Sequence, residues 1–200
     1  MPRVYCASPS EGPIRQGEIL SGLTELRAVG PTSEEDGDQP AEVVKHPFAV
    51  VLTQDCDLDF DFKARQPATT LPHKLLPNIL LAELWLAEQL RGKHDVNHGV
   101  WKRVKQNMDE RYHFLPRVEP EDDALGKGFD DDLTIDFKRL FTIGAETLYT
   151  CIDTTAQRRS CLQSPFMQDL SNRFGYYQIR VALPEIETES SQPAARRTFD

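Results

Sequence analysis

The chain has 200 residues and an acidic balance, with 32 Asp and Glu against 23 Lys and Arg and a formal net charge of -9 at pH 7. This length predicts one domain, and the charge disfavours nucleic-acid partners unless the cations gather in one patch. The four cysteines lack zinc-finger or redox spacing, and every apolar run is too short or too interrupted to cross a membrane. We therefore expect a cytoplasmic protein without a membrane partner.

The first half of the chain predicts two strands joined by a loop. Residues 16–20 begin the first strand, and its apolar pattern continues at Leu23 and Leu26. Residues 30–42 are acidic and rich in glycine and proline, so we expect a mobile loop there. Residues 46–52 are mostly apolar and β-branched, which is typical of a strand buried on both faces. We expect this run to be the central strand of the sheet.

Acidic and apolar residues alternate directly after the central strand. The acidic positions are Asp55, Asp57, Asp59 and Asp61. If the chain stays extended, these carboxylates form a ladder on one face, and Cys56 points into the core from the other. Such a ladder is typical of a solubilising edge or of a docking surface for basic residues. We therefore expect an acidic docking face and a buried, unreactive thiol.

The second half of the chain predicts helices that pack on the sheet. Residues 75–91 carry apolar side chains around most of the helical circumference, Trp85 among them, and residues 94–108 indicate a second helix. Together they predict a helical insertion at about residues 75–108. Ser164 and Pro165 are typical of a helix start, and Gly175 is typical of its end. We expect this last helix to pack over the sheet as well.

Further strands are predicted from alternating apolar residues. They lie at residues 111–115, 133–137, 147–152 and 177–183, with a turn in 138–143 and an acidic loop at 119–132. Residues 185–200 are polar and predict a disordered tail. This leaves a single α+β domain over residues 1–184.

The signature motifs of several enzyme classes do not occur. The chain has no Gly-x-Gly-x-x-Gly, no glycine loop that ends in Gly-Lys-Ser/Thr and no Gly-x-Ser-x-Gly, which argues against dinucleotide, phosphate-loop and serine-hydrolase sites. Asp55 and Asp57 flank Cys56 and oppose formation of a thiolate. We expect neither a cofactor nor a metal. Two alternatives are a zinc site drawn from Cys56, His73, His94 and His98, and a metal-dependent hydrolase with Asp55, Asp57 and His73 as ligands.

Two segments in sequence resemble the opening of MazF/PemK-type toxins: residues 16–20, Gln-Gly-Glu-Ile-Leu, and residues 46–52, His-Pro-Phe-Ala-Val-Val-Leu. Residues 133–148 are similar to a later strand of that family and the stretch after it. The resemblance implies a bent antiparallel SH3-like β-barrel that carries the inserted and C-terminal helices. It also implies RNA cleavage, for which the family uses an arginine before this proline. Here His46 occupies that position, and histidine lacks the fixed charge and the bidentate fork of arginine.

These features favour a non-catalytic interaction protein of a prokaryotic toxin–antitoxin-like or defence-associated system. Its partner would be another protein with a basic surface. The residues expected to bind it are Asp55, Asp57, Asp59, Asp61 and Trp85. The main rival is a MazF/PemK-like endoribonuclease that binds RNA and uses His46, with Thr53 or His113 nearby. The second rival is the metal-dependent hydrolase.

Overall fold

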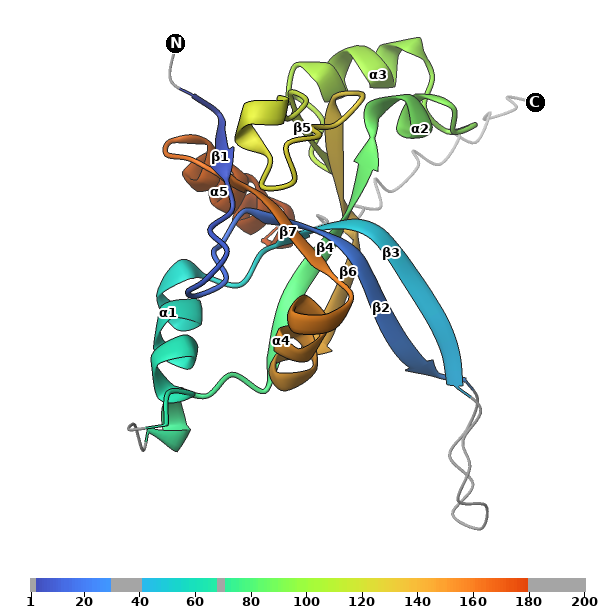
Figure 1. The fold of residues 1–200 in the computed structure, drawn as a ribbon. Coiled ribbons are helices and arrows are strands. Elements are labelled where there is room, and N and C mark those ends of the chain that lie inside the picture. Colours follow the sequence, from blue (N-terminus) through green and yellow to red (C-terminus); the bar gives the residue numbers. More distant parts are fainter. Residues whose placement is uncertain (1–2, 30–40, 68–70, 180–200) are drawn as a thin grey trace, which may run out of the picture.

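One antiparallel sheet of seven strands organises the computed structural model, which describes residues 3–29, 41–67 and 71–179 (Figure 1). Its strands are β1 Tyr5–Ala7, β2 Glu18–Ala28, β3 Ala41–Val51, β4 Asn78–Leu86, β5 Tyr112–Leu115, β6 Leu133–Gly144 and β7 Gln157–Leu162, in the spatial order β1-β7-β2-β3-β4-β6-β5. The helices are α1 Asp55–Ala64, α2 Ala87–Arg91, α3 His98–Lys105, α4 Ala145–Thr154 and α5 Phe166–Gln178, with 3-10 turns η1 Pro72–Lys74 and η2 Pro120–Asp122. The predicted α+β class with an antiparallel sheet is confirmed.

The sheet has helices on both faces. Leu170 of α5 packs into the hydrophobic cluster of one face, whereas Leu58 of α1 and Leu148 of α4 belong to the cluster of the other. The strand order ends at β1 and β5, and within the described ranges no pairing joins these two edges into a closed barrel. The same ranges contain no helix that is both long and apolar enough to span a membrane.

Strand β3 is the central strand, as the sequence predicts, because it is the fourth of seven in the sheet. Its last residues are buried on both faces: Val50 packs with Ile19 of β2 in one cluster, and Ala49 and Val51 pack with Leu20 in the other. Apolar residues of alternating direction are what this position requires. The run of residues 49–52 therefore joins the two hydrophobic clusters.

The predicted acid ladder is wrong, because residues 55–64 form helix α1. The alternating pattern also satisfies helical spacing: Asp59 pairs with Lys63 at 2.6 Å and Asp61 with Arg65 at 2.8 Å, both four residues apart. Asp55 and Asp57 lie in the first turn, where the helix dipole favours carboxylates. The helix distributes the four aspartates over different directions and leaves Cys56 exposed, so the predicted buried thiol is also wrong.

The predicted helix over residues 75–91 is also wrong over most of its length, because residues 78–86 form strand β4 and only residues 87–91 are helical. Ile79 and Leu81 belong to one hydrophobic cluster and Ala82 and Leu84 to the other. A strand buried on both faces carries apolar residues at every position, so its periodicity does not separate it from a buried helix. The predicted helical insertion thus reduces to α2 and α3.

The C-terminal half mixes confirmed and wrong predictions. Helix α3 and strand β5 fall inside their predicted ranges, and β6 begins at Leu133 as expected but runs on to Gly144. Residues 147–152 form part of α4 instead of a strand, and α5 continues past Gly175 to Gln178, so no strand begins at Tyr177. Strands β1 and β7 were not predicted. Of the expected loop at 30–42, residues 30–40 lie outside the described residues, as does the expected tail at 185–200, whereas residues 41 and 42 are part of β3 and not of a loop.

Asp61 and Asp57 give a direct test of the helical arrangement of the aspartates. The Asp61 side chain is fully buried and accepts hydrogen bonds from Arg65, from the Leu76 backbone N–H at 2.7 Å and from the Tyr149 hydroxyl at 3.1 Å. Asp61→Ala leaves these donors unpaired and is expected to lower the free energy of unfolding by about 3 kcal/mol. Asp57 is exposed, so Asp57→Ala should change it by less than about 0.5 kcal/mol. Equal losses in urea unfolding of the two variants would contradict this arrangement.

Candidate functional site

Strands β2 and β3 extend beyond the rest of the sheet as a two-stranded arm, formed by residues 22–28 and 41–48. β3 pairs with β4 only at residues 49–51, and β2 pairs with β7 only at residues 18–21, whereas β2 and β3 pair with each other out to Ala28 and Ala41. Figure 1 shows the two strands curving away together. Gly22, with a φ of 74°, and Pro47 mark the start of the arm. β3 and β4 therefore diverge and leave a fork between them.

A bulge in β6 lies across β4 from this fork. β4 pairs with β6 at Ala82↔Leu140 and again at Leu84↔Ile135, so residues 136–139 of β6 face the single residue Glu83. The extra residues bring the Arg139 side chain to Glu83, with Nη1 donating to Oε2 at 3.1 Å. Bulges are common beside functional sites because they redirect side chains.

A pocket of about 260 Å³ occupies the fork; we call it the Trp85 pocket. Its walls come from β3, β4, the bulge of β6 and α2, and they consist of Lys45, Pro47, Phe48, Glu83, Leu84, Trp85, Gln89 and Arg139. The pocket thus combines two aromatic rings with two cations and one carboxylate. Such a lining suits a ligand that has both an apolar and a charged part.

Cations surround the indole ring of Trp85. Lys93 places Nζ 3.5 Å from the ring centroid, and the Arg139 guanidinium carbon lies 5.1 Å from it. Burial and the neighbouring Arg139 charge lower the pKa of Lys93 below its ordinary value. The one carboxylate of the pocket, Glu83, already accepts from Trp85 Nε1 at 3.2 Å and from Arg139. The charge that remains to attract a ligand is therefore positive.

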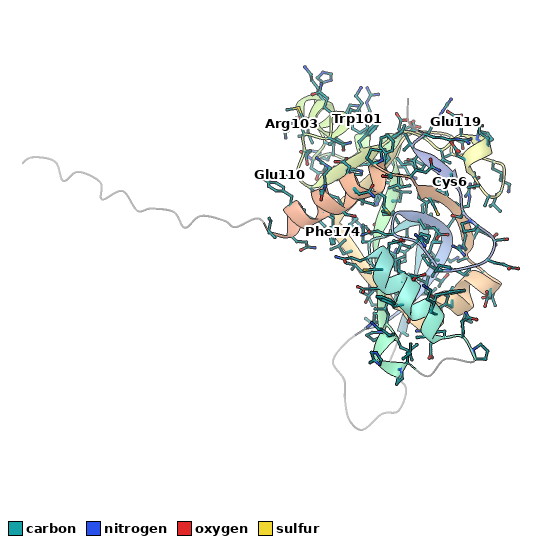
Figure 2. All side chains as sticks on the ribbon, turned by 90° about the vertical axis from the view of Figure 1, so that its left-hand side faces the viewer. Cys6, Trp101, Arg103, Glu110, Glu119 and Phe174 are labelled. Atoms are coloured by element: carbon teal, nitrogen blue, oxygen red, sulfur yellow. The ribbon has the colours of Figure 1, made fainter. Side chains whose placement is uncertain are left out.

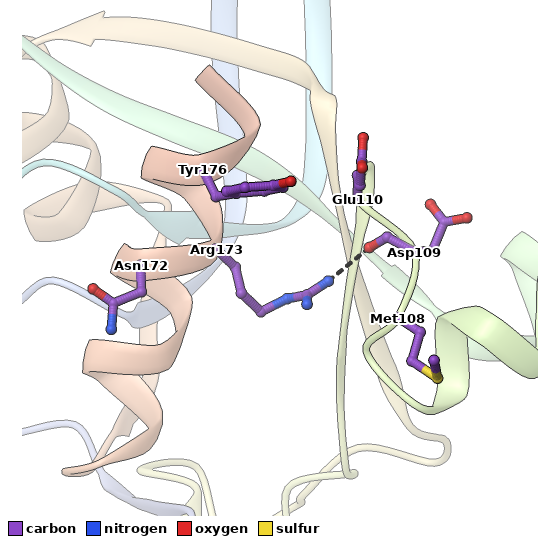
Figure 3. A pocket seen from close by; sticks show the side chains of 6 residues that line it. All are labelled: Met108, Asp109, Glu110, Asn172, Arg173 and Tyr176. Carbon is purple, nitrogen blue, oxygen red and sulfur yellow. Dashed lines mark hydrogen bonds between the residues drawn. The ribbon is translucent and has the colours of Figure 1, made fainter. Parts of the chain in front are cut away.

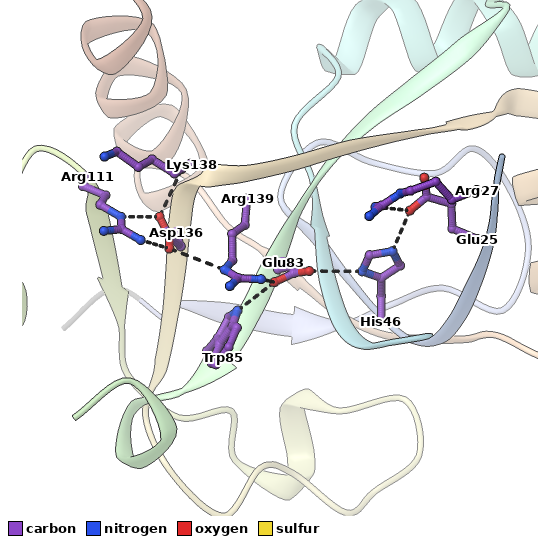
Figure 4. Close-up of polar contacts among 9 residues, drawn as sticks. All are labelled: Glu25, Arg27, His46, Glu83, Trp85, Arg111, Asp136, Lys138 and Arg139. Atoms are coloured by element: carbon purple, nitrogen blue, oxygen red, sulfur yellow. Dashed lines mark hydrogen bonds and ion pairs between the residues drawn. The ribbon is translucent and has the colours of Figure 1, made fainter. Parts of the chain in front are cut away.

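A chain of ion pairs and close contacts between His46 and carboxylates extends from the arm to Arg111, just before β5, along the wall of this pocket (Figure 4). Its members, in order, are Arg27, Glu25, His46, Glu83, Arg139, Asp136 and Arg111. Burial alone would raise the pKa of Glu25, but hydrogen bonds from His46 and Arg27 outweigh it and lower that pKa. At the other end, Arg111 donates to both oxygens of Asp136, at 2.8 and 2.7 Å. The network fixes Glu83 and Arg139 in place.

The three residues predicted for RNA cleavage have separate structural positions. His46 is 2% exposed, stacks on Phe141 at a centroid distance of 3.8 Å and lies 3.0 Å from Glu25 through Nε2. Thr53 accepts a hydrogen bond from the Leu80 backbone N–H. His113 is 1% exposed and has no hydrogen-bond partner at either ring nitrogen. Within the described chain, no hydrogen bond or ring contact brings these three side chains together as a catalytic group.

The predicted acidic docking residues are also dispersed. Asp55 accepts from the Arg15 guanidinium and from the Gln16 backbone N–H, Asp59 pairs with Lys63, and Asp61 is buried. Asp57 alone of the four remains exposed without a cation partner in the described structure. Among the residues that the structure describes, no three His, Cys, Asp or Glu side chains gather in a way that could hold a metal, so Asp55, Asp57 and His73 form no such site. Of the predicted partner-binding residues, Trp85 lines a pocket, the one described above.

A second hollow, of about 510 Å³, lies between α5 and the segment before β5 (Figure 3). Arg173 from α5 donates to the carbonyl oxygens of Asn107, Asp109 and Tyr112. Phe174 packs against Phe137 with ring centroids 5.6 Å apart, and Figure 2 shows its helix beside the segment that carries Glu110. These contacts attach α5 to the sheet, so we assign this hollow a structural role.

His113 makes the stability of the fold depend on pH. Burial and the nearby Arg173 charge lower the pKa of His113 from 6.5 to about 3. The unfolded chain takes up this proton below about pH 6.5 while the folded chain does not, so stability falls as the pH drops from there. We expect a loss of about 2 kcal/mol between pH 7 and pH 5 from this group. His113→Leu should remove that part of the loss in urea unfolding, and an unchanged pH dependence would contradict a neutral buried imidazole.

The geometry singles out the Trp85 pocket. The sequence did not predict Lys45 and Arg139, the cations of its lining, or Lys93, which lies over the indole ring. The doublet of Lys138 and Arg139 inside an otherwise alternating strand is the one sequence signal for the bulge. Comparison with known proteins adds no assignment to this site: no protein-family model matches the chain, and no curated protein matches it in sequence.

Proposed function

We propose that this chain is a non-catalytic interaction protein that binds a partner protein through the Trp85 pocket. The observation that carries the proposal is an indole ring flanked by Lys93 and Arg139, in an open pocket at the fork between two strands. Tryptophan and arginine are the residue types most enriched among interface hot spots. Trp85 and Arg139 both donate to Glu83, so this part of the lining is formed before the partner arrives.

The charges of the pocket change the chemistry that we propose for the partner. The sequence suggested a basic partner surface that docks on four aspartates, but three of these are engaged by Arg15, by Lys63 or within the core. Lys45 and Arg139 of the pocket lining outnumber its one carboxylate, Glu83, which Arg139 pairs with, and Lys93 adds a further positive charge over the Trp85 ring. The group that enters the pocket is therefore acidic.

A toxin–antitoxin-like or defence-associated context remains part of the proposal and rests on the MazF/PemK resemblance. The two segments that carry the resemblance, residues 16–20 and 46–52, do lie side by side, because β2 and β3 are antiparallel neighbours. The finer relationship to an SH3-like barrel is likewise a proposal. It is supported by that hairpin and by the strong divergence of its arm, while the described sheet itself is open.

The proposal predicts that capture of the partner depends on Trp85 and not on Asp57. Tagged full-length chain is used to isolate bound proteins from its native host, and binding of the recovered partner is then titrated. Trp85→Ala should weaken binding at least about tenfold, as for a hot-spot residue. Asp57→Asn, on exposed α1, should bind as the wild type does, and both variants should melt with the wild-type cooperativity.

Two outcomes would contradict the proposal. Loss of binding in Asp57→Asn together with normal binding in Trp85→Ala would place the interface on α1. Alternatively, metal-independent cleavage of a mixed RNA pool that is lost in His46→Ala would favour the endoribonuclease reading. The RNA assay therefore accompanies the binding titration on the same preparations.

A further inference from the structure

We propose that the partner binds as an added β-strand along the open edge of β3 and places an acidic side chain in the Trp85 pocket. This inference rests on the proposed function and specifies the partner as an extended, acidic segment. Three independent features of the fork support it: a free backbone edge, the position of the pocket beside that edge, and the charge and apolar surface along it.

The backbone of β3 is free on one side along the arm. Residues 41–48 pair with β2, but within the described ranges no strand or loop pairs with them on the side away from β2. Every second residue of a strand directs its N–H and C=O groups to a given side, so this edge offers a row of unpaired donors and acceptors. Such an edge accepts an extended peptide through main-chain hydrogen bonds.

The pocket lies directly beside this edge. Lys45, Pro47 and Phe48 of β3 form one wall, and Glu83 and Trp85 of β4 form the other, where the two strands separate. A strand that continues the position of β4 along β3 must therefore pass the pocket. Because alternate side chains of a strand point to one face, a single residue of the added segment can enter it while its backbone pairs with β3.

The arm also presents apolar surface that an added strand would cover. Leu26 and Val43 are directly opposite each other in the register, and they are 74% and 54% exposed. Cross-strand neighbours of this kind gain stability when another side chain packs beside them. In the added segment, an apolar residue separated from the acidic residue by an even number of positions would lie on the same face and pack next to Val43.

Charge selects an acidic segment over the alternatives. Lys45 and Arg139 in the pocket wall suit a carboxylate, Lys93 over the indole ring adds positive charge, and Trp85 suits the apolar stem that carries the carboxylate. Lys45 and Pro47 on the edge also disfavour indiscriminate pairing, which native edges commonly prevent with lysine and proline. A second copy of this chain would bring residues 41–46, Ala-Glu-Val-Val-Lys-His, to the edge, and Lys45 of that segment cancels the charge of its one carboxylate, Glu42, so the segment is not acidic.

The proposal is tested by peptide display: a library of random peptides about twelve residues long is selected for binding to the immobilised full chain. Peptides that bind wild type and not Trp85→Ala should share Asp or Glu with apolar residues in alternation. Each backbone amide of one selected peptide is then N-methylated in turn. Methylation at every second position should weaken binding about tenfold, and methylation at the positions between should have little effect, since only one side of a strand faces β3.

Charge-reversing variants supply the matched comparison. Lys45→Glu, in the pocket wall, should weaken the selected peptide at least about tenfold, whereas Lys102→Glu, exposed on α3, should not. If no peptide depends on Trp85, both this inference and the proposed pocket are overturned. If such peptides exist but methylation shows no alternation, strand addition alone is overturned. Two further outcomes would overturn the proposal of an acidic partner segment. One is that the selected peptides are basic. The other is that the free chain sediments as a dimer and that the peptide dissociates this dimer.

Discussion

The burial of residues 49–52 on both faces of the sheet is the constraint on which the rest of the structure depends. Ala49 and Val51 belong to one hydrophobic cluster, and Val50 and Leu52 to the other. This stretch is the only part of β3 that pairs with β4, and β2 pairs with β7 at the matching level. Beyond it, β2 and β3 pair only with each other among the residues that the structure describes. The short central overlap therefore creates both the arm and the fork in which the Trp85 pocket lies.

The sequence predicts an element of this fold correctly where its residue pattern is compatible with a single type of secondary structure. The run at residues 46–52 is β-branched and uninterrupted, and it is the central strand as expected. Residues 55–62 satisfy both a period of two and a spacing of four, and the pairing of Asp61 with Arg65 in the core selects the helix. Residues 78–86 are apolar throughout because β4 is buried on both faces, which a sequence pattern does not separate from a buried helix.

Of the residues in the candidate site, the sequence predicted only Trp85. The others could not be predicted because the fold, and not a local sequence pattern, brings them together. Lys45, Lys93 and Arg139 are far apart in the sequence. The divergence of β3 from β4 brings Lys45 to the pocket, the β6 bulge brings Arg139 to the indole, and the turn after α2 brings Lys93 to it. None of these follows from local pattern, because each depends on the register between strands. Conversely, His46 stands out in the sequence before Pro47, but the fold buries it between Glu25, Glu83 and Phe141, where it supports the network that positions the pocket wall.

The account depends most directly on the edge of β3 being open in solution. Amide hydrogen exchange of the free full-length chain, resolved residue by residue by NMR, measures this property. Along residues 41–46 we predict alternating exchange rates: amides directed to β2 are protected, and those directed away from it exchange rapidly. At residues 49–51, which pair on both sides, we predict that every amide is protected. Uniform protection throughout residues 41–46 would contradict the account, because the edge would then already be covered.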